Sequence, residues 1–378
     1  MDNGSTIRDS YLTFPSWTQN FFTWLTGKAL NNQRPLFVSS IWIHFFTPLS
    51  LFILGILGNI YVITDQLSVN WFLIPIFWIF VVAGTRNMVL TIRHECVHNR
   101  FSSNKNINKI LGELVTILLV VRTAKAYQYD HVSLHHNNEI LCSRKDPHIH
   151  YLAEWGLKLG MSKKKLWINL AKTLLSPYFY LKSTYDRIKA NVTAKNFTRR
   201  FLAIVYLLGL SYVCWVSSVP LYKLIVAFFF PLFVLSTASS LIETISEHPM
   251  PPEQNVVLIK NKREALTVKC WSILSGAELP LQTKSLAIKT YRWIIWIIKM
   301  IGHLIVRLTI LPGPLPSHEM HHRKPGQYDW RVAFYEKQKD IQTGHSEWPP
   351  YREIWGLIRS LDLVFHDMSQ WESLDETH

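Results

Sequence analysis

Four apolar segments, each long enough to cross a lipid bilayer, constrain this chain more than any other feature. A helix that spans the hydrocarbon core needs about 20 mainly apolar residues. The segments that meet this requirement are residues 37–63, 71–90, 201–219 and 221–242. Because only short loops join the first to the second and the third to the fourth, we predict two hairpins. The fold class is therefore predicted to be all-α: a polytopic membrane protein with about four transmembrane helices and a cytoplasmic helical cap.

The distribution of lysine and arginine predicts how these helices are oriented. Residues 91–200 are rich in both, including the run Lys163–Lys165, whereas the hairpin tips hold almost none. The positive-inside rule then places residues 91–200 and both termini in the cytoplasm, at a bacterial inner membrane or the endoplasmic reticulum. The net charge of +14 is spread between apolar runs, which favours an anionic membrane surface and no nucleic-acid partner.

Three regions follow from these spans. Residues 1–36 form an N-terminal segment, 37–325 the membrane domain, and 326–378 a cytoplasmic C-terminal extension. Within the first, residues 14–30 are aromatic-rich and fit either an interfacial helix or a packed soluble helix. Residues 107–121 are too short to span easily and fit a re-entrant segment. Residues 291–311 carry several cations and are expected to lie in the membrane interface.

Histidines gather in three clusters and one single position, all on the predicted cytoplasmic side. Residues four apart share one face of a helix, so several of these pairs are expected to be neighbours. The candidate residues are His94 and His98 in HECVH, His131, His135 and His136 in DHVSLHH, His248 in SEHP, and His318, His321 and His322 in HEMHH. His148 and His150 are expected to be ordinary loop histidines.

This number of imidazoles is best explained by metal binding. Buried and uncoordinated, they would need many separate partners, and protonated together they would repel one another. Metal ions bind the neutral form, and nine nitrogens suit two ions with four or five each. A structural zinc site would prefer cysteine, whereas imidazole suits iron. Cys96 points away from the His94/His98 face of a helix, and no catalytic residue is predicted beyond the ligands.

Two other classes of protein compete with this interpretation. HECVH fits the H-E-x-x-H pattern of zinc metalloproteases, but the longer metzincin pattern fails at Phe101 and Asn104. A metal transporter would carry ionisable residues at mid-membrane, where this chain has few. The acidic neighbours of the histidines either orient the imidazoles or are simply polar surface residues; they are Glu95, Asp130, Glu247 and Glu319.

The ordered set HECVH, HVSLHH, EH and HEMHH over four spans resembles the integral-membrane fatty acid desaturase and hydroxylase superfamily, across roughly residues 37–325. DHVSLHH and SEHP are also similar to the membrane alkane hydroxylases of that superfamily. The resemblance implies two non-heme iron ions (Fe²⁺), held by the nine histidines named above. It also implies that O₂ and two electrons are used to attack an unactivated C–H bond.

The same resemblance sets the expected reaction and its partners. Desaturation of a fatty acyl chain of a lipid or thioester comes first, because HECVHNRF resembles the first box of desaturases. Hydroxylation of an alkyl or isoprenoid chain is the alternative, and a membrane zinc protease is a more distant one. The middle box departs from many desaturases in having three residues before its histidine pair. No heme-binding H-P-G-G stretch is present, so electrons are expected from a separate ferredoxin, rubredoxin or cytochrome b5.

Overall fold

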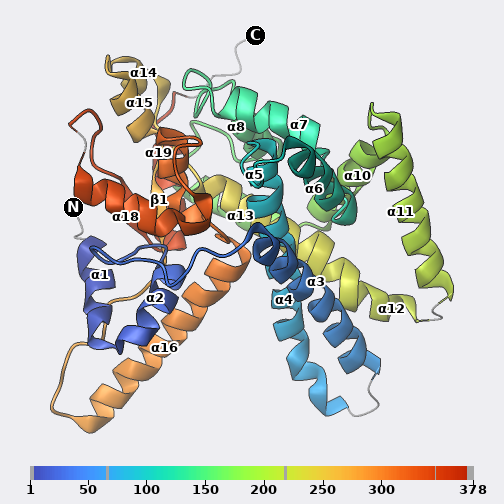
Figure 1. Cartoon of the computed structure of the whole chain (residues 1–378), viewed down its shortest axis with the longest axis horizontal. Helices are drawn as coiled ribbons and strands as arrows, with labels where there is room; N and C mark the ends of the chain where they lie inside the picture. Colours follow the sequence, from blue (N-terminus) through green and yellow to red (C-terminus); the bar gives the residue numbers. More distant parts are fainter. Residues whose placement is uncertain (1–3, 65–67, 217–218, 345, 373–378) are drawn as a thin grey trace. The chain divides into compact units, whose positions relative to one another are not determined.

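The computed structural model describes residues 4–64, 68–216, 219–344 and 346–372. Most of these residues are helical, as Figure 1 shows. The chain divides into two compact units. Unit 1 comprises Met1–Val38, Leu141–Ile168 and Glu243–His378, and unit 2 comprises Ser39–Ile140 and Asn169–Ile242.

Four helices are long and apolar enough to cross a membrane, as the sequence predicts. They are Ile41–Thr64, Asn70–Val97, Phe197–Val216 and Leu221–Ser246. Each overlaps a predicted span, although the predicted end of the third crosses residues 217–218, which lie outside the described residues. The second helix continues to Val97, well beyond the predicted end at Leu90, and therefore carries His94 at its last turn. The protein is an integral membrane protein on this evidence.

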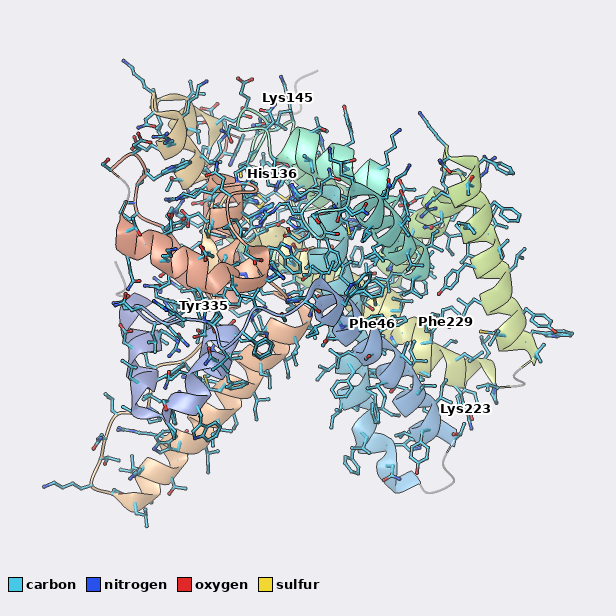
Figure 2. The ribbon with its side chains drawn as sticks, viewed as in Figure 1. Phe46, His136, Lys145, Lys223, Phe229 and Tyr335 are labelled. Atoms are coloured by element: carbon cyan, nitrogen blue, oxygen red, sulfur yellow. The ribbon has the colours of Figure 1, made fainter. Side chains whose placement is uncertain are left out.

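The first two spans of unit 2 form a closely packed hairpin. They are α3 (Ile41–Thr64) and α4 (Ile74–Asn87). A Cβ atom on Gly84 would lie only 2.5 Å from the carbonyl oxygen of Pro48, so the absence of a side chain lets the two backbones approach. Phe46 of α3, labelled in Figure 2, is 54% exposed, as expected for a side chain that faces lipid.

The third and fourth spans differ from the predicted second hairpin. The fourth, made of α12 (Leu221–Leu224), η6 (Ile225–Leu235) and α13 (Ser236–Ser246), packs on the first hairpin. Its Ala227 carbonyl accepts a hydrogen bond from the buried amide of Asn59 at 3.2 Å. The third, α11 (Phe197–Val216), is fixed near its start, where buried Arg199 donates to Asn191 Oδ1 at 2.7 Å. Figure 1 shows α11 and α12 diverging from their connection, so consecutive spans here do not pack along their length.

The remaining helices of unit 2 cluster around the ends of the spans. They are α5 (His94–Val97), α6 (Lys105–Leu118), α7 (Ala124–Gln128), η5 (Tyr129–His135) and α10 (Pro177–Val192). At 14 residues, α6 is shorter than a membrane span, as predicted, and its re-entrant placement remains a prediction.

Unit 1 is also helical but contains one short parallel strand pair that the all-α prediction omits. Strand β1 (Ser272–Leu274) pairs with β2 (Glu353–Trp355) over three residues each, too few to produce a recognisable alternating pattern in the sequence. The helices that matter below are α1 (Gly4–Ser10), α2 (Gln19–Thr26), α16 (Leu286–Thr309), α17 (His318–Arg323), α18 (Ala333–Thr343) and α19 (Leu357–Ser369).

A buried charge cluster connects three parts of unit 1 that are distant in sequence. Glu353 of β2 accepts from Lys337 of α18 at 2.8 Å and also pairs with Lys28 of the N-terminal segment. Burial alone would raise the pKa of Glu353, but the two lysines hold it at about 2. The N-terminal segment, α18 and the C-terminal strand are therefore held together in one compact unit.

Candidate metal centre

The first histidine box lies at the cytoplasmic end predicted for the second span, where the helix changes its winding. A π-helical turn, η4 (Met88–Arg93), leads directly into α5. The rings of His94 and His98 lie side by side with centroids 4.8 Å apart, as expected for residues four apart on one face. Glu95 lies 3.1 Å from His94 Nδ1 through one oxygen and 3.5 Å from Arg100 through the other. Cys96 packs on α6 beside Gly112, away from the two rings.

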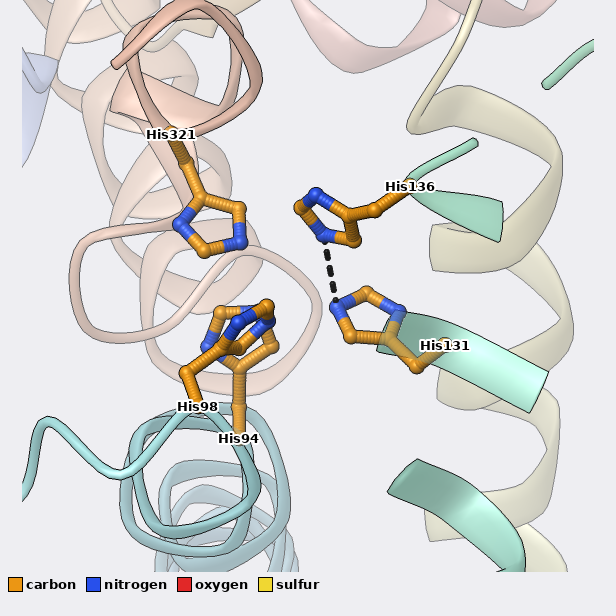
Figure 3. A group of neighbouring side chains, drawn as sticks. All are labelled: His94, His98, His131, His136 and His321. Atoms are coloured by element: carbon orange, nitrogen blue, oxygen red, sulfur yellow. Dashed lines mark hydrogen bonds between the residues drawn. The ribbon is translucent and has the colours of Figure 1, made fainter. Parts of the chain in front are cut away.

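The second box is π-helical, which adds a further pair of neighbouring histidines. In η5 the N–H of His136 donates to the carbonyl of His131, five residues earlier, at 2.9 Å. The Nε2 atoms of these two rings are 3.2 Å apart, the contact drawn as a dashed line in Figure 3. The sequence pattern indicates His131 with His135 on one face. The wider π turn also brings His136 beside His131, and the rings of His131 and His135 stack with their centroids 5.4 Å apart, as their spacing predicts.

Four imidazoles from these two boxes, two of them buried and two partly buried, form one cluster within unit 2. Each of His94, His98, His131 and His136 offers a nitrogen, and these nitrogens lie within 4.8 Å of one another (Figure 3). Burial, followed by the neighbouring His94, lowers the pKa of His98 to about 2. Burial also lowers the pKa of His131 well below its usual range. His98 and His131 are therefore neutral at physiological pH, which is the form that binds metal.

Two residues that the sequence analysis did not single out support this cluster. The ring of Tyr127 stacks on His131 at 5.0 Å with an interplanar angle of 10°. The Arg93 guanidinium lies over the Tyr127 ring, 3.7 Å from its centroid. An arginine and a tyrosine 34 positions apart carry no pattern that reveals such a contact, so only the folded chain shows it.

A second buried cluster belongs to unit 1 and combines the single histidine with the third box. The rings of His248, His318 and His322 lie with centroids 4.6 to 4.8 Å apart. His318 Nε2 is 3.0 Å from the Nε2 atoms of both other rings. His248 Nδ1 lies 2.8 Å from the carbonyl oxygen of Lys269. Because a carbonyl can only accept, Nδ1 carries the proton and Nε2 is left as the metal-binding atom.

The acidic residue inside the third box faces away from the histidines. Glu319 is fully buried, pairs with Arg323 through one oxygen, and accepts the backbone N–H of Arg352 at 2.8 Å through the other. In a zinc protease the glutamate of H-E-x-x-H must face the water that the metal activates. Glu319 is instead bound to the residue that precedes β2, so this second H-E-x-x-H match lacks the geometry of a protease.

The comparison with known families agrees with this arrangement. A family model described as fatty acid desaturase matches residues 69–276. This chain belongs to the fatty acid desaturase family. No curated protein matches it significantly. The matched residues include the first two boxes and His248, whereas the third box lies beyond them.

Members of this family are known for diiron centres, and the donor set here fits metal ions. Both clusters consist of imidazoles, with no thiolate among them, and that composition suits iron better than a structural zinc site. The hydrogen bond that fixes the tautomer of His248 is of the kind that orients metal-binding histidines.

The remaining predicted residues have distinct positions. His135 stacks on His131 within unit 2, and His321 lies with its ring 5.7 Å from that of His318 within unit 1. Glu247 approaches His318 Nε2 at 3.1 Å and His148 Nδ1 at 3.8 Å. Asp130 forms a partly exposed ion pair with Arg122, away from the rings. Of the four acidic neighbours, Glu95 and Glu247 therefore contact a predicted ligand, whereas Asp130 and Glu319 bind arginines.

Proposed function

We propose that this protein is a membrane oxidoreductase that uses two iron ions, held by its histidines, to desaturate the acyl chain of a lipid or thioester. The observation that carries the proposal is the presence of two clusters of imidazoles in a chain of the fatty acid desaturase family. Bound iron would supply the reduction of O₂ and the removal of hydrogen from an unactivated C–H bond.

Each of the two clusters is proposed to bind iron through its own histidines. Unit 2 contributes His94, His98, His131 and His136, and unit 1 contributes His248, His318 and His322. His135 and His321 each lie beside one cluster and bring the number of imidazoles to nine, which is four or five for each ion. Glu95 and Glu247 would orient the rings that they contact.

The chain's own contribution is to position the ligands and exclude water. The rings are buried or partly buried, and Tyr127 covers one side of His131. Desaturation removes two hydrogens from adjacent carbons, and two further protons and two electrons complete the reduction of O₂ to two waters. The sequence contains no heme-binding H-P-G-G stretch, so a separate ferredoxin, rubredoxin or cytochrome b5 is proposed to supply the electrons. The excess of lysine and arginine in residues 91–200 supports a cytoplasmic position for the histidines and both termini.

Hydroxylation of an alkyl or isoprenoid chain is the second candidate. One sequence observation favours it: three residues, rather than two, separate His131 from the His135–His136 pair, as in the alkane hydroxylases that DHVSLHH resembles. The balance differs in one respect, because one oxygen atom enters the substrate and only one water is released.

The test is expression of the full chain with a compatible reductase, followed by lipid profiling and metal analysis. New double bonds support desaturation, and new alcohols support the second candidate. Purified protein should hold about two irons per chain, and His131→Ala or His318→Ala should each lower that content. His366→Ala, an exposed histidine of α19, is the matched control and should retain iron. One zinc per chain in place of iron, with no change in lipids, would favour the protease alternative and refute the proposal.

A further inference from the structure

Helix α16 of unit 1 presents a stripe of isoleucines that nothing in the described residues covers. The stripe is formed by Ile294, Ile297, Ile298, Ile301 and Ile305, and all five are exposed. The last four follow Ile294 by three, four, seven and eleven residues, a spacing that places all five on one face of the helix. At 24 residues, α16 is about 36 Å long, so the stripe is an extended apolar surface.

The opposite face of α16 is already occupied by the N-terminal segment. Trp296, Met300 and Leu304 pack against a buried cluster that contains Tyr11 and Phe22. Trp296 Nε1 also donates to the carbonyl of Ala277 at 3.1 Å. The isoleucine stripe is therefore not the packing face of the helix, and its exposure needs a separate explanation.

The N-terminal segment that packs on α16 adds exposed aromatic residues. Trp17 is 80% exposed, and Phe21 and Trp24 are also exposed. Tryptophan is enriched where a protein meets the boundary between lipid and water. The two segments for which the sequence indicates an interfacial position, residues 14–30 and 291–311, thus pack together in unit 1.

Charge identifies the partner of this surface. The cations along α16 and the loop before it, apart from the buried Arg307, are Lys284, Lys289, Arg292 and Lys299, and residues 281–311 contain no aspartate or glutamate. The same surface of a second copy would bring like charges together, whereas anionic phospholipid attracts them. A lysine in the middle of the helix also disfavours a fully buried transmembrane position.

We propose that α16 and the N-terminal segment form a second membrane-binding surface, separate from the four spans. In this arrangement α16 lies in the headgroup layer, with its isoleucine stripe among the acyl chains and its cations near anionic phosphates. The proposal does not depend on the reaction proposed above, because it concerns only where this surface lies.

The position of α16 bears directly on the third histidine box. The helix ends at Thr309, and His318 follows nine residues later. Arg307 is buried and fixes the turn between them, donating to the carbonyls of Leu311 and Gly313, the latter at 2.6 Å, and to that of Trp24 at 2.8 Å. Lipid contact along α16 therefore sets the depth of the third box relative to the membrane.

Site-specific fluorescence in nanodiscs tests this proposal with the full chain. Ile298→Cys in a Cys214→Ser background places a small fluorophore on the stripe, since the other three cysteines are buried. Ile358→Cys is the matched control, because Ile358 is an exposed isoleucine of α19, away from α16. Brominated lipid should quench the label at position 298 and leave that at 358 unquenched, and aqueous iodide should do the reverse.

Two results would overturn the proposal. Quenching of the position 298 label by iodide would place the stripe in water. Insensitivity to both quenchers would show that protein, either another part of the chain or a second copy, covers it. The role of charge is tested with the double variant Lys289→Glu/Lys299→Glu. Quenching by brominated lipid should increase when phosphatidylglycerol is added to phosphatidylcholine, and this increase should be lost in the variant. If it persists in the variant, the cations do not recognise anionic lipid.

Discussion

Replacing Arg323 with methionine should destabilise unit 1 because it leaves a buried carboxylate without its main counter-charge. The side chains of Arg323 and Glu319 are 2% and 0% exposed, respectively. Arg323 also donates to the carbonyls of Pro349 and Pro350 at 2.7 and 3.0 Å. This one guanidinium therefore connects the third histidine box to the segment that leads into β2.

The size of the effect follows from the burial of the pair. Breaking a buried ion pair by removing one partner typically costs about 3–5 kcal/mol, mostly because the remaining charge is uncompensated. Burial already raises the pKa of Glu319 to about 7 even with Arg323 in place. In the variant Glu319 can take up a proton, which reduces the loss in the free energy of unfolding to about 3 kcal/mol at neutral pH. At about 2–4 °C for each kcal/mol in a unit of this size, the apparent Tm should fall by about 6–12 °C.

The assay is thermal unfolding of purified protein at a fixed scan rate, with iron content measured in parallel, since unfolding of membrane proteins is often irreversible. Arg331→Met is the matched control, because Arg331 forms a more exposed pair with Asp329 that should contribute no more than about 1 kcal/mol. The double variant Glu319→Gln/Arg323→Met should recover part of the lost stability, since it removes the buried charge as well. If Arg323→Met behaves like the control, or the double variant is no more stable than the single one, the reasoning is wrong.

Three further predictions concern other parts of the molecule. Tyr127→Leu should weaken iron binding by about tenfold by removing the ring that supports His131, whereas Tyr127→Phe keeps the stacking and should bind normally; equal iron retention in both variants would contradict this. The pKa of Glu353 is held at about 2, below its ordinary 4.5, so its stabilisation is present above pH 4.5 and is lost as the pH falls towards 2. Acid unfolding in that range should therefore be weaker in Glu353→Gln, and an unchanged pH profile would refute the assignment. Gly84→Leu should lower stability by about 1–3 kcal/mol because a side chain there meets the facing helix, whereas Gly209→Leu, with nothing within 4 Å, should not; apparent Tm values compare them.

The sequence alone was sufficient to predict the four spans. Spans are recognisable because the bilayer requires a long uninterrupted apolar segment, which is a local property of the chain. The pairing of His94 with His98 was equally predictable, because an α-helix brings residues four apart together whatever surrounds it. The membership in the desaturase family agrees with the resemblance that the histidine boxes carry.

Only the tertiary structure decided how the boxes are supported. The π-helix that brings His136 beside His131 depends on surrounding packing, because its wider turn has no sequence pattern of its own. The Arg93–Tyr127–His131 stack and the hydrogen bond from the Arg352 N–H to Glu319 likewise join residues whose neighbours are set by the fold. The three-residue strand β2 and the exposure of the isoleucine stripe of α16 were also decided by the tertiary structure. Periodicity reveals which residues share a face, but long-range packing determines which faces are buried and which remain exposed to meet a membrane.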